Sequence, residues 1–188
     1  YQVPAIMRHR QGLGTTLVIS PLIALMDDQV HQLRAKGVAA AALHSHQSAD
    51  EQKEALLQLR HGELALVYAS PERALNPGFR RQLDLSNVSA LAVDEAHCIS
   101  QWGHDFRPEY NQLATLRTSL DVPMIALTAT ATPRIEKEIL KRLALREPLI
   151  ARSSFIRPNL AFSLHGIPSD QERMAKTCQI LEARGLRG

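Results

Sequence analysis

The sequence predicts an α/β fold with a doubly wound, mainly parallel sheet. Four short segments, 15–20, 64–69, 89–94 and 123–128, are apolar on both faces, as strands are when helices cover both sides of a parallel sheet. Amphipathic segments with helical spacing separate them, and several have capping residues at their ends. Such alternation of strands and helices is typical of a doubly wound α/β domain.

The first segment after strand 15–20 is predicted to be a helix over 22–36. Its apolar side chains share one helical face, and Gly37 follows as a residue that commonly ends helices. Residues 39–43 come next and are rich in alanine. They fit either a strand or a tightly packed segment, and the sequence leaves both open.

Capping residues mark two later helices. Ser48 and Glu51 have the spacing of a capping box, and Gly62 is expected to end the helix that they begin. Thr132 is expected to cap a helix whose first residue is Pro133. Both signals place a helix directly after a polar loop.

The remaining helices are predicted at Pro108 and near the C-terminus. Pro108 opens a segment with leucines at helical spacing, and Ser169 with Glu172 repeats the capping box. An irregular polar stretch at 152–159 interrupts the pattern, so a domain boundary is predicted there. Residues 160–188 then fit a strand followed by a helix.

Composition is that of an ordinary globular protein. Of the 188 residues, 45% are hydrophobic and 22% charged, which is enough for one core and part of a second. The net charge of +3 permits a polyanionic partner without requiring one. No segment approaches the ~20 apolar residues that span a bilayer, so we expect a cytosolic protein without membrane contact.

Cysteine and histidine positions do not predict a metal site or a disulfide. Cys98 and Cys178 lie far apart, and their scarcity fits a reducing compartment. His44 and His46 are two residues apart, but no carboxylate or thiol partner stands at a recognisable spacing. A dedicated transition-metal site is therefore not expected.

The strongest chemical signal is the pair Asp94 and Glu95 at the end of an apolar run. Ligands of open α/β sheets bind outside the carboxyl ends of the strands, and this is such an end. One carboxylate can hold Mg²⁺ on nucleotide phosphates while the other reaches the attacking water. A chance pair of acids at the start of a loop is the alternative.

The segment that follows is rich in aromatic residues. Trp102 and Phe106 are interleaved with His104 and Arg107, which is the composition of a platform where bases stack and a cation meets phosphate. A buried aromatic cluster is the alternative, and the polar residues between the rings disfavour it. Tyr110 shares the apolar stripe of the next helix, so it is expected in the core.

Residues 94–110, DEAHCISQWGHDFRPEY, resemble the nucleotide-binding motif and adjoining aromatic-rich loop of RecQ helicases, within helicase superfamily two. The resemblance implies a RecA-like P-loop NTPase lobe. It also implies an ATP-dependent DNA helicase of DNA repair and recombination that moves 3′ to 5′ on single-stranded DNA and unwinds duplexes. Its cofactors would be ATP and Mg²⁺, and its partners single-stranded and partially duplex DNA. A cytoplasmic location follows, at the nucleoid if the source is bacterial.

The resemblance also implies a role for each candidate residue. Asp94 would anchor Mg²⁺ through the nucleotide, and Glu95 would be the general base toward water. His97, Thr128 and Thr130 would relay the state of the nucleotide. The residues that would bind or sense DNA are Trp102, His104, Phe106, Arg107, Ser20, Pro21 and Arg73.

Further motifs follow the order of that family. The segment 20–26 resembles its first DNA-contacting motif, although a capped helix start explains the same residues. Arg73, in a segment resembling the next motif, could neutralise a phosphate, but a structural pairing is favoured. Residues 128–132 resemble the motif that links nucleotide to DNA, and 155–159 the segment that joins the two lobes.

A glycine-rich loop ending in Lys-Ser or Lys-Thr does not occur in the sequence. The resemblance therefore predicts a first RecA-like lobe at 1–152 that lacks its phosphate-binding strand. It predicts the inter-lobe connection and the start of a second lobe at 153–188. The fold is expected to be truncated at both ends. We expect a catalytically incomplete chain with apolar surface exposed near the missing strand.

Two other functions stay open. One is a non-catalytic nucleic-acid-binding module, either a fragment or a degenerate paralogue. The other is a double-strand DNA translocase or an RNA helicase of the same superfamily, which the aromatic loop disfavours.

Overall fold

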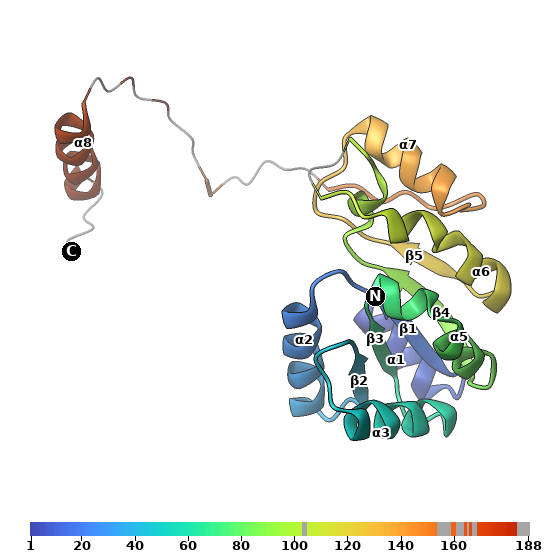
Figure 1. The fold of residues 1–188 in the computed structure, drawn as a ribbon. Coiled ribbons are helices and arrows are strands. Elements are labelled where there is room, and N and C mark those ends of the chain that lie inside the picture. Colours follow the sequence, from blue (N-terminus) through green and yellow to red (C-terminus); the bar gives the residue numbers. More distant parts are fainter. Residues whose placement is uncertain (103–104, 154–158, 161–163, 165, 167–168, 184–188) are drawn as a thin grey trace. The chain divides into compact units, whose positions relative to one another are not determined.

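A computed structural model describes the chain except for residues 103–104, 154–158, 161–163, 165, 167–168 and 184–188 (Figure 1). The chain divides into two compact units, Tyr1–Pro148 and Leu149–Gly188. The first contains the sheet, and the second contains helix α8 (Asp170–Ala183). The helix expected near the C-terminus is thereby confirmed. The strand expected after residue 160 falls largely on residues outside the described part.

The sheet of the first unit has five parallel strands in the order β2-β3-β1-β4-β5 (Figure 1). The four strands predicted between residues 15 and 128 are present, and the alanine-rich segment is also a strand because it pairs with its neighbour. The strands are β1 (Thr15–Ile19), β2 (Ala40–Leu43), β3 (Leu66–Ala69), β4 (Val88–Val93) and β5 (Met124–Ala126).

Alternate residues of the strands pack into two separate cores. Leu17 and Val67 belong to one core, whereas their neighbours Val18 and Tyr68 belong to the other. Side chains of a strand alternate between the faces of a sheet, so helices must cover both faces. This arrangement confirms the predicted doubly wound class.

The helices divide between these cores. Helices α1 and α2 contribute to the core of Val18, and α3, α4, α5, α6 and α7 to the core of Leu17. Their bounds are α1 (Gln2–Arg10), α2 (Ile23–Ala35), α3 (Ala49–Arg60), α4 (Pro71–Leu75), α5 (Pro77–Asp84), α6 (Ala114–Leu120) and α7 (Pro133–Arg142).

The predicted caps are present. The Ser48 hydroxyl accepts the Glu51 amide at 3.3 Å, and the Glu51 carboxylate accepts the Ser48 amide at 2.8 Å, which completes the capping box of α3. At α7 the Thr132 hydroxyl accepts the Ile135 amide at 3.3 Å. Each such cap contributes about 1 kcal/mol to the stability of the fold.

The helix expected at Pro108 differs from the prediction. A 3₁₀ helix, η2 (Pro108–Gln112), comes first, and α6 begins only at Ala114. The tighter turn, with the Tyr110 amide donating to the Arg107 carbonyl at 3.1 Å, accompanies the full burial of the Tyr110 ring. The core position of Tyr110 is thus confirmed, and the packing of that ring overrides the α-helical spacing of the leucines.

β5 stands at one edge of the sheet and is the least covered strand. Ile125 is 43% exposed, and its two neighbours in the strand are half-buried, whereas the inner strands β1 and β3 are fully buried. Across the described ranges, no helix combines the length and the apolar character that crossing a membrane requires.

Candidate functional site

The acidic pair lies at the carboxyl edge of the sheet. Asp94 follows the last residue of β4, between β1 and β5, and its amide donates to the Ile19 carbonyl at 2.8 Å. The Asp94 Oδ1 atom accepts the Glu95 amide at 3.0 Å. One hydrogen bond holds the Asp94 backbone and the other holds its half-buried carboxylate, at the crevice where an open α/β sheet binds its ligands.

Glu95 has a strained backbone. Its φ of 47° and ψ of 44° lie in the left-handed region, which costs a residue with a Cβ about 1–2 kcal/mol. The turn lets the Ala96 amide reach the Leu127 carbonyl at 2.8 Å, and it starts the 3₁₀ helix η1 (Ala96–Ile99). Strain of this kind is often retained where a side chain must be held for function.

His97 joins the acidic motif to the segment after β5. Its Nδ1 atom lies 3.1 Å from Glu95 Oε2 and 2.9 Å from Thr128 Oγ1. The Thr128 hydroxyl donates to the Thr130 carbonyl at 3.0 Å and accepts the Thr130 amide at 3.2 Å. Since the single hydroxyl proton is directed to that carbonyl, the network assigns the imidazole proton to Nδ1.

Tyr110 ties the aromatic-rich segment to the acidic motif. Its hydroxyl donates to the Asp94 carbonyl at 3.0 Å. Burial raises the pKa of Tyr110 above its ordinary value, so the hydroxyl stays protonated and can donate. A shift of the segment around Tyr110 would therefore act directly on the backbone of Asp94.

Cys98 lies between the two motifs. Burial, together with the negative charge of Asp105, raises the pKa of the Cys98 thiol to about 12. Its sulfur is 3.7 Å from Asp105 Oδ2. The thiol is therefore neutral and serves packing.

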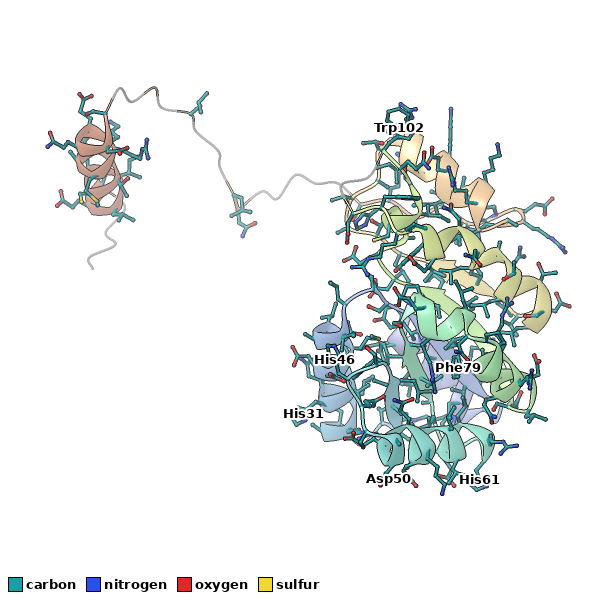
Figure 2. The ribbon with its side chains drawn as sticks, in the orientation of Figure 1. His31, His46, Asp50, His61, Phe79 and Trp102 are labelled. Carbon is teal, nitrogen blue, oxygen red and sulfur yellow. The ribbon has the colours of Figure 1, made fainter. Side chains whose placement is uncertain are left out.

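Trp102 is exposed, unlike Tyr110. Its side chain is 63% exposed and lies beside α7 (Figure 2). The Arg134 guanidinium carbon lies 3.5 Å from the centroid of the Trp102 ring. A buried aromatic cluster is therefore wrong for Trp102, and the ring is accessible to a base.

The other loop residues are less exposed. Phe106 and Arg107 are half-buried, and the Arg107 amide donates to the Cys98 carbonyl at 2.9 Å. Arg107 Nε lies 3.9 Å from Asp105 Oδ2. His104 lies outside the described residues.

The family model for DEAD/DEAH box helicases matches residues 1–139. This chain belongs to the DEAD/DEAH box helicase family. The residues DEAH at 94–97, whose contacts are described above, lie within the matched region.

Curated relatives place this DEAD/DEAH box helicase chain in the RecQ branch. It is 43% identical over 189 residues to the ATP-dependent DNA helicase RecQ of Haemophilus influenzae, covering 100% of this chain and 30% of the relative. The Bacillus subtilis protein of the same name is 47% identical over 166 residues, covering 87% and 27%. The ATP-dependent helicase SGS1 of Saccharomyces cerevisiae is 40% identical over 171 residues, covering 88% and 12%. The chain thus spans less than a third of each.

A solved structure supports the fold. The helicase domain of Pyrococcus furiosus Hef superposes with a TM-score of 0.55 at 20% sequence identity, covering 78% of this chain and 31% of that structure. At this identity the likeness concerns the fold alone. It agrees with a RecA-like lobe.

In this DEAD/DEAH box helicase chain, Ser20 and Pro21 are buried at the end of β1. Ser20 is 2% exposed, and its hydroxyl has no hydrogen-bond partner among the described residues. Because the Ile19 carbonyl accepts the Asp94 amide, Ser20 stands next to the acidic motif. Its position favours a role inside the crevice over contact with DNA at the surface.

Arg73 packs against Phe79. Its guanidinium carbon lies 5.4 Å from the centroid of that ring, and burial lowers the pKa of Arg73. This placement agrees with the structural role that the sequence favours.

A groove of the DEAD/DEAH box helicase chain lies away from these residues. This groove of about 900 Å³ between α2 and α3 is lined by His44, whose Nε2 lies 2.8 Å from Asp27 Oδ1. The sequence did not reveal this carboxylate partner, because the pair forms only when α2 packs on β2. Within the described ranges, no group of three or more His, Cys, Asp or Glu side chains could hold a metal ion.

Proposed function

We propose that this chain is part of an ATP-dependent helicase that moves 3′ to 5′ along single-stranded DNA and unwinds duplex DNA. The names of its relatives support the activity. One observation carries the proposal. The segment that contains the exposed Trp102 is hydrogen-bonded to the acidic motif, because the Tyr110 hydroxyl donates to the Asp94 carbonyl. Binding of DNA at Trp102 can therefore alter the site that handles the nucleotide.

The donor set at the strand ends fits Mg²⁺, the cation that accompanies ATP. Asp94 offers carboxylate oxygen, and the buried Ser20 hydroxyl beside it lacks a partner among the described residues. Oxygen ligands are what this hard cation prefers. When bound, Mg²⁺ neutralises charge on the nucleotide phosphates.

We assign to Glu95 the role of acting on water. Its side chain is 29% exposed at the crevice, and its strained backbone holds it there. In the proposed mechanism Glu95 takes a proton from the attacking water. Its contact with His97 Nδ1 orients the carboxylate, and His97 passes the change to Thr128 and on to Thr130.

The loop residues would sense the strand. A base would stack on Trp102, with Phe106 and His104 completing the surface and Arg107 meeting phosphate. A stacked base contributes about 1–3 kcal/mol to binding. We place this activity in the cytoplasm, with residues 1–152 as the first RecA-like lobe and 153–188 as the link to a second lobe.

Glu95→Gln in the natural full-length polypeptide that contains this chain tests the proposal. The substitution keeps the size of the side chain and removes the base. The expected result is ATP hydrolysis reduced by at least about 10²-fold, with binding of single-stranded DNA unchanged. Hydrolysis at the wild-type rate would refute the role of Glu95. Equal stimulation of the wild type by RNA and single-stranded DNA would refute the proposed substrate.

A further inference from the structure

Arg134 stands out among the basic residues. It is the second residue of α7, where the helix dipole disfavours a cation by about 0.3–1 kcal/mol. It is exposed, and it forms no ion pair with a carboxylate in the part of the chain that the structure describes. Its contact is with the Trp102 ring, 3.5 Å from guanidinium carbon to ring centroid. The position is therefore not explained by the stability of the helix.

The contact covers one face of the Trp102 ring. A guanidinium within about 6 Å of a ring centroid is attracted by the negative face of the ring. The side chain nevertheless remains 63% exposed, so the opposite face is open to solvent. An indole has two faces, and a base needs only one of them.

We propose that Arg134 is a binding residue for single-stranded nucleic acid, which holds Trp102 for stacking and meets the adjacent phosphate. The inference rests on the proposed function and adds a residue outside the aromatic-rich loop. A base stacks on the open face of the ring, between Trp102 and solvent. The guanidinium on the other face limits rotation of the indole and places a positive charge beside the stacked nucleotide.

The position of Arg134 also connects the loop to the relay. It follows Thr132, the cap of α7, by two residues, and Thr132 ends the segment that begins with Thr128. Ile135, the next residue, packs in the same core as Ala96 and Ile99 of η1. The helix that carries Arg134 therefore packs against η1, which contains His97, and begins directly after the segment that contains Thr128.

The first experiment needs no nucleic acid. Trp102 is the single tryptophan of the chain, so intrinsic fluorescence of the 188-residue protein reports on this ring alone. Arg134→Ala should raise the acrylamide quenching constant about twofold, because one of two faces is uncovered. Lys137→Ala, an exposed cation one turn further along α7, is the matched control and should leave quenching unchanged. Equal quenching in wild type and Arg134→Ala would overturn the proposed contact.

The second experiment titrates oligothymidylate into the same proteins. Wild type should bind, and binding should quench Trp102 fluorescence. Arg134→Ala should bind about tenfold more weakly. Its slope of log affinity against log salt concentration should be smaller in magnitude by about 0.7. Arg134→Lys should keep the salt slope and lose part of the affinity, because an ammonium lacks the planar stacking surface. Lys137→Ala should lose less affinity than Arg134→Ala.

Two outcomes separate the inference from the proposed function. Wild-type affinity and salt slope in Arg134→Ala, or tighter binding by it, would overturn the inference while leaving the proposed DNA contact at Trp102 intact. Tighter binding would mean that Arg134 blocks the face that the base needs. Failure of the wild-type chain to bind or to show quenching would overturn both. Far-UV circular dichroism of each variant confirms that the fold is retained.

Discussion

Replacing Tyr110 with phenylalanine should destabilise the fold by about 1–2 kcal/mol, although only one oxygen is lost. The Tyr110 hydroxyl donates to the Asp94 carbonyl at 3.0 Å, and the residue is fully buried. A buried hydrogen bond contributes about 0.5–1.5 kcal/mol, and a carbonyl left without its donor costs about 1–3 kcal/mol. The Tyr110 side chain is fully buried, so we expect a loss of about 1–2 kcal/mol, near the middle of the span that the two ranges cover together.

Urea denaturation followed by far-UV circular dichroism measures this loss. The midpoint should fall while the slope of free energy against urea stays unchanged, because the same surface is exposed on unfolding. Tyr68→Phe is the control. The Tyr68 hydroxyl accepts the Gln2 side chain at 3.2 Å, and Gln2 is partly exposed, so water can replace the bond and the loss should be below about 1 kcal/mol. A Tyr110→Phe variant as stable as wild type, or more stable than Tyr68→Phe, would refute the reasoning.

Two further predictions concern stability and reactivity. Gly14→Ala should lower the free energy of unfolding by at least about 2–3 kcal/mol, because φ is +118° and the new Cβ would lie 2.3 Å from the Asn87 carbonyl oxygen. Gly12→Ala should lower it by about 1–2 kcal/mol, because φ is +73° but the space around the new Cβ is open. Equal urea midpoints for the two variants would contradict this. With its pKa raised to about 12, Cys98 has a thiolate fraction of about 10⁻⁴ at pH 8, so iodoacetamide should modify only the exposed Cys178 until the chain unfolds. Rapid modification of both thiols at pH 8 would be incompatible with a buried, neutral Cys98.

The fold class was predictable because its signal is local. Strands that are apolar on both faces require two cores, and the structure has two. The assignment of β2 was open, since its alanines gain strand character only by pairing with β3. Helix α5 was missed, although Asn76 is a cap that precedes a proline. That signal was present and could have been used.

The position of Asp94 was predictable from the sequence, but the contacts around it were not. Asp94 stands at a strand end, which hydrophobic patterning alone locates. The His97–Thr128 hydrogen bond depends on β5 lying beside β4, and the Arg134–Trp102 contact depends on α7 packing against η1. Such contacts join residues about thirty positions apart, and no local pattern encodes them.

The central claim is that the surface around Trp102 communicates with the crevice of Asp94. The most direct test is steady-state ATP hydrolysis by the natural full-length polypeptide, with and without single-stranded DNA, in Trp102→Ala and Arg107→Ala variants. The account predicts an unchanged basal rate and a loss of the stimulation by DNA in both variants. Stimulation of both to the wild-type extent would contradict it.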